Sequence, residues 1–145
     1  MIYLDTSYIV KAYVNEPGSD EVLKELANKT GLVSSILGRI EFTSALMRQR
    51  RAKELSKSES EQAQFSLESD TQNNIWTWTP ISREITQQAT KLLIHPKTYG
   101  ILRTLDAIHL ASAMSIDAKL IYTHDKRMLE AAQHFGLKAR DVIPN

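Results

Sequence analysis

The stretch Ile2-Tyr3-Leu4-Asp5-Thr6-Ser7, at residues 2–7, consists of three apolar residues and then three polar ones. The apolar triplet predicts a short buried strand, and the apolar residues within 9–14 predict a short helix that the segment 15–18 ends. A further helix is expected over residues 20–26 and a second strand over residues 31–34. This order is typical of a βαβ unit, in which a helical crossover joins two parallel strands.

Strand and helix patterns continue to alternate through the rest of the chain. We expect a helix from Ser35 to the basic cluster at 48–51, a helix over 56–74, a strand over 75–79 and a helix that Ser82 caps. A buried helix should follow from Thr104 or Leu105 to Ile116, and then a strand over 119–123. The chain should end with a helix over 126–135, which Gly136 terminates, and a last strand near 139–143. This alternation predicts an α/β fold with a parallel sheet covered on both faces. Without a linker or repeat, residues 1–145 are expected to form a single domain.

Composition narrows the function classes. The 145 residues include 18 basic and 17 acidic side chains, a formal net charge of +1, and no cysteine. The lack of cysteine excludes thiolate metal sites, thiol nucleophiles and disulfides. The chain has no signal-peptide pattern and no window near the ~18 apolar residues of a membrane span, so we expect a cytoplasmic protein without a membrane partner. The near-zero charge means that any contact with nucleic acid has to be local.

Four acidic residues are expected to meet at one edge of the sheet. Asp5 follows the first strand directly, and Asp125 follows the strand at 119–123. Glu41 lies in the helix after the second strand, and Asp106 lies in the first turn of the buried helix. Ligands of open α/β sheets bind outside the carboxyl ends of the strands, which is where these four side chains are predicted to converge.

Carboxylates gathered in a half-buried crevice repel one another unless a positive charge lies among them. Mg²⁺ or Mn²⁺ supplies such a charge and prefers oxygen ligands. An ion of this kind can activate a water for in-line attack on phosphorus and neutralise the charge that develops. The reaction class predicted from these residues is phosphodiester hydrolysis.

Each of these acids also has a simpler interpretation. Asp5 and Asp125 each precede an expected helix and so occupy possible N-cap positions, and Asp106 can complement a helix dipole. Glu41 is harder to explain in that way, because its neighbours Ile40 and Phe42 are apolar and suggest an inward-facing helix. The common place of the four favours a shared site, since these four alone among the 17 acidic residues are expected at this edge.

Several motifs together resemble a known family. They are residues 2–7, Val10-Lys11, Glu-Pro-Gly-Ser at 16–19, Ser34-Ser35 leading to Ile40-Glu41, Leu105 to Ala113, and Thr123-His124-Asp125-Lys126-Arg127-Met128. These motifs look like the PIN domain and, more closely, like its VapC-type toxin ribonucleases. The resemblance extends from residue 2 to about residue 136, and the segment 50–80 contributes little to it.

The resemblance implies a three-layer α/β/α fold with a central parallel sheet, RNA cleavage, a homodimer and a cognate VapB-like antitoxin that covers the site. The positions that match the family are the acidic quartet Asp5, Glu41, Asp106 and Asp125, which binds Mg²⁺ or Mn²⁺, and the supporting hydroxyls of Thr6 and Thr123. The sequence departs from the pattern of many members at His124, and its contact with substrate is left open. The segment 48–73 is the surface expected to dimerise.

Other polar and aromatic residues have more than one interpretation. Arg103, Lys126 and Arg127 are close in sequence to two of the acids and are candidates for RNA contact. The basic residues of 48–53 form either a phosphate-binding lip or a solvated helix end. His109 is expected to be a hydrogen-bonded structural histidine rather than a metal ligand. The tryptophans at 76 and 78 are expected to pack on each other rather than stack on bases.

The leading hypothesis is a metal-dependent endoribonuclease, the toxin of a VapBC-type system. One alternative is a catalytically inactive PIN-like module that binds RNA or protein, which absence of Mn²⁺ binding would favour. Another is an RNA-processing PIN nuclease outside a toxin–antitoxin system, which the lack of a small upstream reading frame would favour. A haloacid-dehalogenase-type phosphatase is disfavoured because Ser7 stands where its second aspartate belongs, and the chain has no P-loop, dinucleotide turn or G-x-S-x-G elbow.

Overall fold

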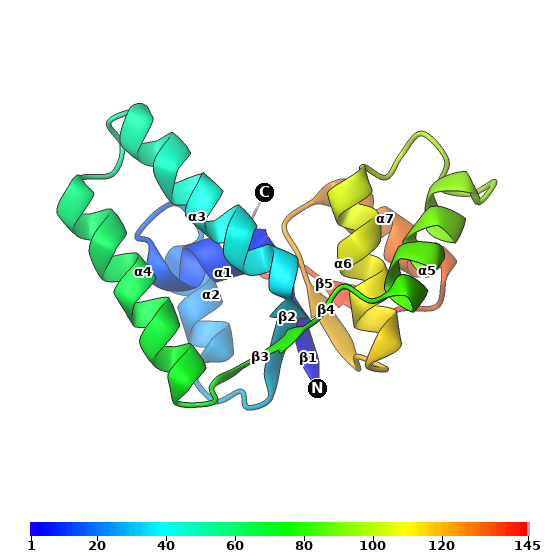
Figure 1. Cartoon of the computed structure of the whole chain (residues 1–145), viewed down its shortest axis with the longest axis horizontal. Coiled ribbons are helices and arrows are strands. Elements are labelled where there is room, and N and C mark those ends of the chain that lie inside the picture. The colour runs from blue at the N-terminus through cyan, green and yellow to red at the C-terminus, as the bar shows by residue number, and fades with distance from the viewer. Residues whose placement is uncertain (145) are drawn as a thin grey trace.

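Five parallel strands form a central sheet in the order β3-β2-β1-β4-β5 in the computed structural model, which describes residues 1–144 (Figure 1). The strands are β1 (Ile2–Leu4), β2 (Leu32–Ser35), β3 (Trp76–Thr79), β4 (Leu120–Tyr122) and β5 (Ala139–Arg140). The helices are α1 (Thr6–Tyr13), α2 (Ser19–Leu26), α3 (Ile36–Arg51), α4 (Lys57–Gln72), α5 (Arg83–Ile94), α6 (Thr104–Ser115) and α7 (Lys126–His134). The predicted α/β fold and the predicted parallel sheet are confirmed.

Two apolar cores lie on opposite faces of this sheet. Tyr3 and Ile121 point into the core shared with α5, α6 and α7, while Leu4 and Tyr122 point into the core shared with α1 to α4. Successive strand residues face opposite sides of a sheet, so β1, β2 and β4 each contribute to both cores. Figure 1 shows the result, with α1 to α4 on one side of the sheet and α5 to α7 on the other. The predicted three layers are therefore present.

Side-chain caps fix where the helices begin. Ser56 accepts a hydrogen bond from the Glu59 N–H, and the Glu59 carboxylate accepts one from the Ser56 N–H, so the expected capping box is present. Ser82 caps α5 as predicted, and Ser35 caps α3. Each such cap stabilises a helix by about 1 kcal/mol. Because Ser35 is also the last residue of β2, its cap sets α3 at the carboxyl edge of the sheet.

Trp76 and Trp78 pack on each other as expected, with ring centroids 5.4 Å apart and an interplanar angle of 16°. The indole N–H of Trp76 donates to the Tyr13 hydroxyl, which ties β3 to α1. Both tryptophans thus have a structural role in this part of the fold. Within residues 1–144, no helix has the length and apolar character needed to cross a membrane.

Candidate active site

Asp5 and Asp125 are linked through Thr123 at the carboxyl ends of the adjacent strands β1 and β4. Asp5 is 5% exposed and accepts hydrogen bonds from the Ser7 hydroxyl (2.5 Å), the Tyr8 N–H (3.2 Å) and the Thr123 hydroxyl. The Thr123 oxygen in turn accepts the N–H of Asp125 (3.0 Å). Asp5 is therefore the N-cap of α1, as its simpler interpretation predicted. It also lies at the carboxyl edge of the sheet beside Asp125, and this edge is called the acidic edge below.

The carboxylate of Asp125 caps α7. It accepts hydrogen bonds from the N–H groups of Arg127 (2.7 Å) and Met128 (3.4 Å), and the Arg127 guanidinium lies 3.3 Å from its second oxygen. Burial acts to raise the pKa of Asp125, but the hydrogen bonds and charge of Arg127 outweigh burial and hold this pKa below its ordinary value. Asp125 is therefore a stable carboxylate at neutral pH.

The negative charge of Asp106 is less well stabilised by its neighbours than that of Asp125. Its carboxylate accepts the Arg103 N–H (3.1 Å) at the start of α6. Burial raises the pKa of Asp106, and the negative charge of Asp125 raises it further against the opposing effects of Arg103 and Arg127. The effect of Asp125 on the pKa of Asp106 indicates that the two carboxylates, at the starts of α6 and α7, are close enough for their charges to interact.

Glu41 reaches the same edge from α3. Its Oε2 atom accepts hydrogen bonds from the Thr6 hydroxyl (2.6 Å) and from His109 Nε2 (2.6 Å). Burial acts to raise the pKa of Glu41, but the hydrogen bonds from His109 and Thr6 lower it overall. The reason given from sequence was partly wrong, because Ile40 is 67% exposed while Phe42 is buried. Each residue turns a helix by about 100°, so only one of two apolar neighbours of Glu41 faces the core here.

His109 is buried and hydrogen-bonded, as expected, but its partners connect it to the acids. It is 3% exposed, its Nδ1 lies 2.7 Å from the Tyr3 hydroxyl, and the two rings meet edge to face. The contact with Glu41 was not predicted. The sequence did contain a signal, since His109 follows Asp106 by three residues and therefore shares its helix face.

A fifth acidic residue, Asp141, lies at this edge, so the prediction that four acids alone gather there is wrong. Asp141 lies 2.7 Å from His124 Nδ1 and accepts a hydrogen bond from the Tyr8 hydroxyl (2.8 Å). The backbone N–H of His124 donates to the Ser7 hydroxyl, which in turn donates to Asp5. Asp141 directly follows β5, so the rule that identified Asp5 also applies to it.

Comparison with known proteins decides the family. Residues 2–133 match the PIN domain. The chain belongs to the PIN-domain family. It is 34% identical over 138 residues to Ribonuclease VapC46 of Mycobacterium tuberculosis (strain ATCC 25618 / H37Rv), a match that covers 94% of this chain and 93% of the relative.

Two solved structures show the same fold. VapC20 of Mycobacterium tuberculosis, described as a Sarcin-Ricin loop cleaving toxin, superposes with a TM-score of 0.70 at 16% identity, covering 90% of this chain and 95% of that one. VapBC2 from Rickettsia felis, bound to a DNA fragment from its promoter, gives a TM-score of 0.64 at 21% identity, covering 97% and 98%. These two structures confirm the fold, and the sequence match to Ribonuclease VapC46 confirms the resemblance to VapC-type PIN domains.

The acidic edge of this PIN domain has the donor chemistry of a magnesium or manganese site without a closed coordination sphere. Its donors are carboxylate and hydroxyl oxygens, which hard divalent cations prefer. Within residues 1–144, no three acidic or histidine side chains lie together closely enough to hold a metal ion by themselves. Mg²⁺ usually retains several waters and uses one or two carboxylates, so the residue types fit such an ion.

Arginine side chains surround the acids of the PIN domain. The charge of Arg48 on α3 helps to lower the pKa of Glu41, and Arg103 and Arg127 act in the same direction on Asp106. Lys126 is the first residue of α7, beside Asp125. Two of the three predicted RNA-contact residues, Arg103 and Arg127, therefore lie near the acids, as does Arg48 of the basic cluster at the end of α3, and Lys126 is next to Asp125 in the chain.

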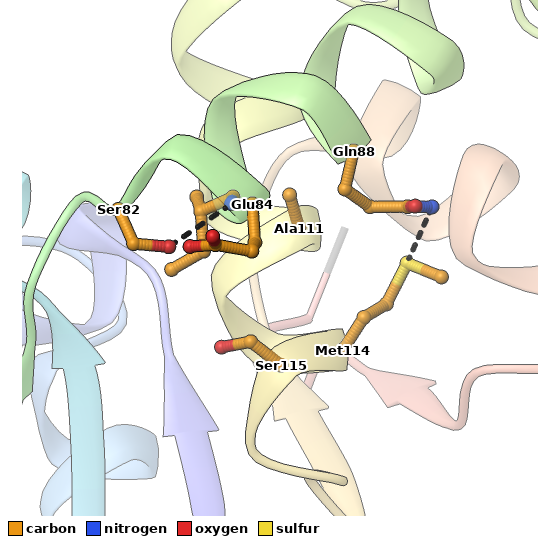
Figure 2. Close-up of a pocket in the computed structure, with 7 residues that line it drawn as sticks. Ser82, Glu84, Gln88, Ala111, Met114 and Ser115 are labelled. Carbon is orange, nitrogen blue, oxygen red and sulfur yellow. Dashed lines mark hydrogen bonds between the residues drawn. The ribbon is translucent and has the colours of Figure 1, made fainter.

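A separate hollow lies between α5 and α6. Figure 2 shows Gln88 and Met114 facing each other across it, with the Gln88 amide 3.8 Å from the Met114 sulfur. The residues that line it are Ser82, Glu84, Ile85, Gln88, Ala111, Met114 and Ser115. None of the four acids of the candidate active site contributes to this hollow, so its shape has no part in the chemistry considered below.

Proposed function

We propose that this PIN-domain protein is a divalent-metal-dependent endoribonuclease, the toxin of a VapBC-type system. The observation that carries the proposal is the convergence of four carboxylates at the carboxyl edge of the sheet, in a chain 34% identical to a VapC ribonuclease. The four are Asp5, Glu41, Asp106 and Asp125. A positive partner would stabilise their charged forms, because burial raises the pKa of Asp5, and burial together with the charge of Asp125 raises that of Asp106.

In this proposal the four carboxylates hold Mg²⁺ or Mn²⁺, and Thr6 and Thr123 orient two of them. When bound, the ion would lower the pKa of a water and offset the charge that develops on phosphorus. Thr123 keeps Asp5 and Asp125 together, and Thr6 fixes one oxygen of Glu41. The protein thereby holds its acidic groups in place before substrate arrives.

Arg103, Lys126 and Arg127 are proposed to bind the RNA backbone beside the acids. Arg103 and Arg127 lie near enough to lower the pKa of Asp106, which supports a role for their positive charges beside the acids. Phosphate contacts position nucleic acid without reading its sequence. The contact is local, which agrees with the formal net charge of +1.

The partners are proposed by analogy with the matched structures. The likeness to Rickettsia felis VapBC2 supports a VapB-like antitoxin, which would cover the acidic edge. A homodimer is also proposed, with the segment 48–73 contributing to its surface. Phe65 on α4 is 69% exposed within that segment, as an apolar contact residue would be in the free monomer. An RNA substrate and an antitoxin partner imply a cytoplasmic protein.

The proposal is tested by cleavage of a structured RNA in Mg²⁺ by the purified protein. Asp106→Asn should abolish cleavage while leaving the fold intact, because the amide cannot replace a carboxylate on a hard cation. Asp20→Asn is the matched control, since Asp20 also lies in the first turn of a helix but is exposed on α2. Equal cleavage by Asp106→Asn and Asp20→Asn would refute the assignment.

One observation favours a second candidate, a PIN-like module that binds RNA or protein without cleaving. The carboxylates of Asp106 and Asp125 are engaged at the starts of α6 and α7, and residues 1–144 contain no ready-made group of three metal ligands. Titration calorimetry with Mn²⁺ near neutral pH separates the two functions. Binding supports the nuclease, and its absence supports the module. A small reading frame directly upstream would distinguish a toxin from an RNA-processing nuclease.

A further inference from the structure

A buried series of hydrogen bonds connects the start of α3 to Glu41 on the same helix. The Ser35 N–H donates to the Tyr3 hydroxyl oxygen (3.0 Å), and the Tyr3 hydroxyl lies 2.7 Å from His109 Nδ1. His109 Nε2 is 2.6 Å from Glu41 Oε2. The series passes through β1 and α6, so it joins elements from both sides of the sheet to one carboxylate.

The direction of each hydrogen bond follows from the donors available. Glu41 is a carboxylate and can only accept, so His109 Nε2 carries the hydrogen. The oxygen of Tyr3 already accepts the Ser35 N–H (3.0 Å), so its own hydrogen is available to the second partner. That hydrogen is directed to His109 Nδ1, which accepts it. Tyr3 therefore holds the imidazole in the orientation that donates to Glu41.

These hydrogen bonds hold one oxygen of the Glu41 carboxylate and leave the other without a donor in the part of the chain that the structure describes. Both hydrogen bonds to its side chain, from Thr6 and from His109, end on Oε2. No group within the described residues 1–144 donates to Oε1, and that atom is not among the buried unpartnered ones. A glutamate side chain that is free in the metal-free protein loses rotamer freedom when it is fixed in one place. The two bonds fix it in advance and leave Oε1 available.

We propose that His109 and Tyr3 are positioning residues, which hold Glu41 so that Oε1 faces the divalent cation and the RNA. The proposal rests on the function proposed above and adds two residues outside the acidic quartet to its machinery. Hydrogen-bond partners of metal ligands contribute substantially to metal affinity, and their loss weakens it by roughly 10–100-fold. A similar loss is expected here for Mn²⁺.

The test compares two tyrosine variants that each lose a single hydroxyl. Tyr3→Phe keeps the ring and removes only the group that orients His109. Tyr13→Phe is the matched control, because the Tyr13 hydroxyl also makes two hydrogen bonds, to Asp70 (2.5 Å) and from Trp76 (2.6 Å), but has no link to Glu41. Both variants should lose a similar amount of stability, so thermal unfolding alone does not separate them.

Mn²⁺ affinity, measured by calorimetry, separates them. Tyr3→Phe should bind Mn²⁺ roughly 10–100-fold more weakly than the wild-type protein, while Tyr13→Phe should bind it unchanged. The ¹⁵N resonance of His109 Nδ1 should change in Tyr3→Phe only. An Mn²⁺ affinity of Tyr3→Phe equal to that of Tyr13→Phe would overturn the proposal.

Variants of the histidine keep the test independent of Tyr3. His109→Gln retains an N–H that can donate to Glu41, whereas His109→Leu has similar size and no donor. Mn²⁺ affinity should therefore fall less in His109→Gln than in His109→Leu, and equal losses would count against positioning. A wild-type protein that binds Mn²⁺ but cleaves no RNA would refute the proposed function alone, because the comparisons of Mn²⁺ affinity would still stand.

Discussion

Replacing Asp5 by Asn is expected to stabilise the metal-free protein at neutral pH. Burial raises the pKa of Asp5, and the hydrogen bonds from Ser7, Thr123 and the Tyr8 N–H only partly oppose this effect. A raised pKa means that the contribution of this group to stability is fully present below its ordinary pKa of 3.8 and is lost as the pH rises through the folded-state value. At pH 7 the buried charge is therefore unfavourable, and Asn removes it.

The magnitude follows from two opposing effects. Each unit by which a folded-state pKa is raised corresponds to about 1.4 kcal/mol of lost stability once the group is ionised. Asn keeps one oxygen as an acceptor for the Ser7 hydroxyl and the Tyr8 N–H, but it takes away the acceptor of the Thr123 hydroxyl, which costs about 1 kcal/mol. Removal of the buried charge opposes this loss, so we expect the free energy of unfolding of Asp5→Asn to exceed that of the wild-type protein; each difference of about 1 kcal/mol raises the Tm by roughly 2–4 °C in a protein of this size.

Thermal and urea unfolding in EDTA at pH 7 measure this gain. Asp125→Asn is the matched control, because Asp125 also caps a helix but has a pKa that Arg127 holds low, so its substitution should destabilise. Saturation with Mn²⁺ at about 100 times Kd should stabilise the wild-type protein by about 2.7 kcal/mol and reverse its order with Asp5→Asn. The reasoning is refuted if Asp5→Asn is less stable than wild type in EDTA.

Three further predictions concern packing and pH. Gly38→Ala places a Cβ 2.9 Å from the Ser34 hydroxyl. The overpacking should lower the free energy of unfolding by about 1–3 kcal/mol, which exceeds the gain of about 1 kcal/mol in helix propensity. A variant that is more stable than wild type in urea would contradict this. Leu110→Ala removes a fully buried side chain of α6 and should lower the unfolding free energy by about 2–5 kcal/mol, so a loss near zero would contradict the packing described. Burial, with help from Glu25, raises the pKa of Tyr122 to about 12 from 10.0, so its contribution is fully present below pH 10 and lost as the pH rises to about 12. Tyr122→Phe should therefore lose less stability than wild type over that range, and equal slopes would count against this.

Local patterns predicted most of the fold. Three apolar residues at 2–4 followed by Asp5 determine a strand and the cap of the next helix, and Ser56 with Glu59 determines the start of α4. The same rule, a polar residue directly after a parallel strand, placed Asp5 and Asp125 at one edge. These predictions held because they depend on neighbours in sequence.

What the sequence did not reveal depends on packing between distant segments. Asp141 was missed because β5 has only two residues, too few for a clear alternating pattern. The exposure of Ile40 depends on the rotation of α3 about its own axis where it packs against α1 and α4. His109 and Glu41 are 68 residues apart, and their contact exists only because α3 and α6 begin at the same edge of the sheet.

The central claim is that the acidic edge cleaves RNA with the help of a divalent cation. The measurement that tests it most directly is RNA cleavage by the wild-type protein after removal of metal with EDTA and after addition of Mn²⁺. The account predicts that cleavage stops in EDTA and returns with Mn²⁺, because the cation is proposed to lower the pKa of the attacking water and to offset the charge that develops on phosphorus. Cleavage that continues at the same rate in EDTA would contradict it.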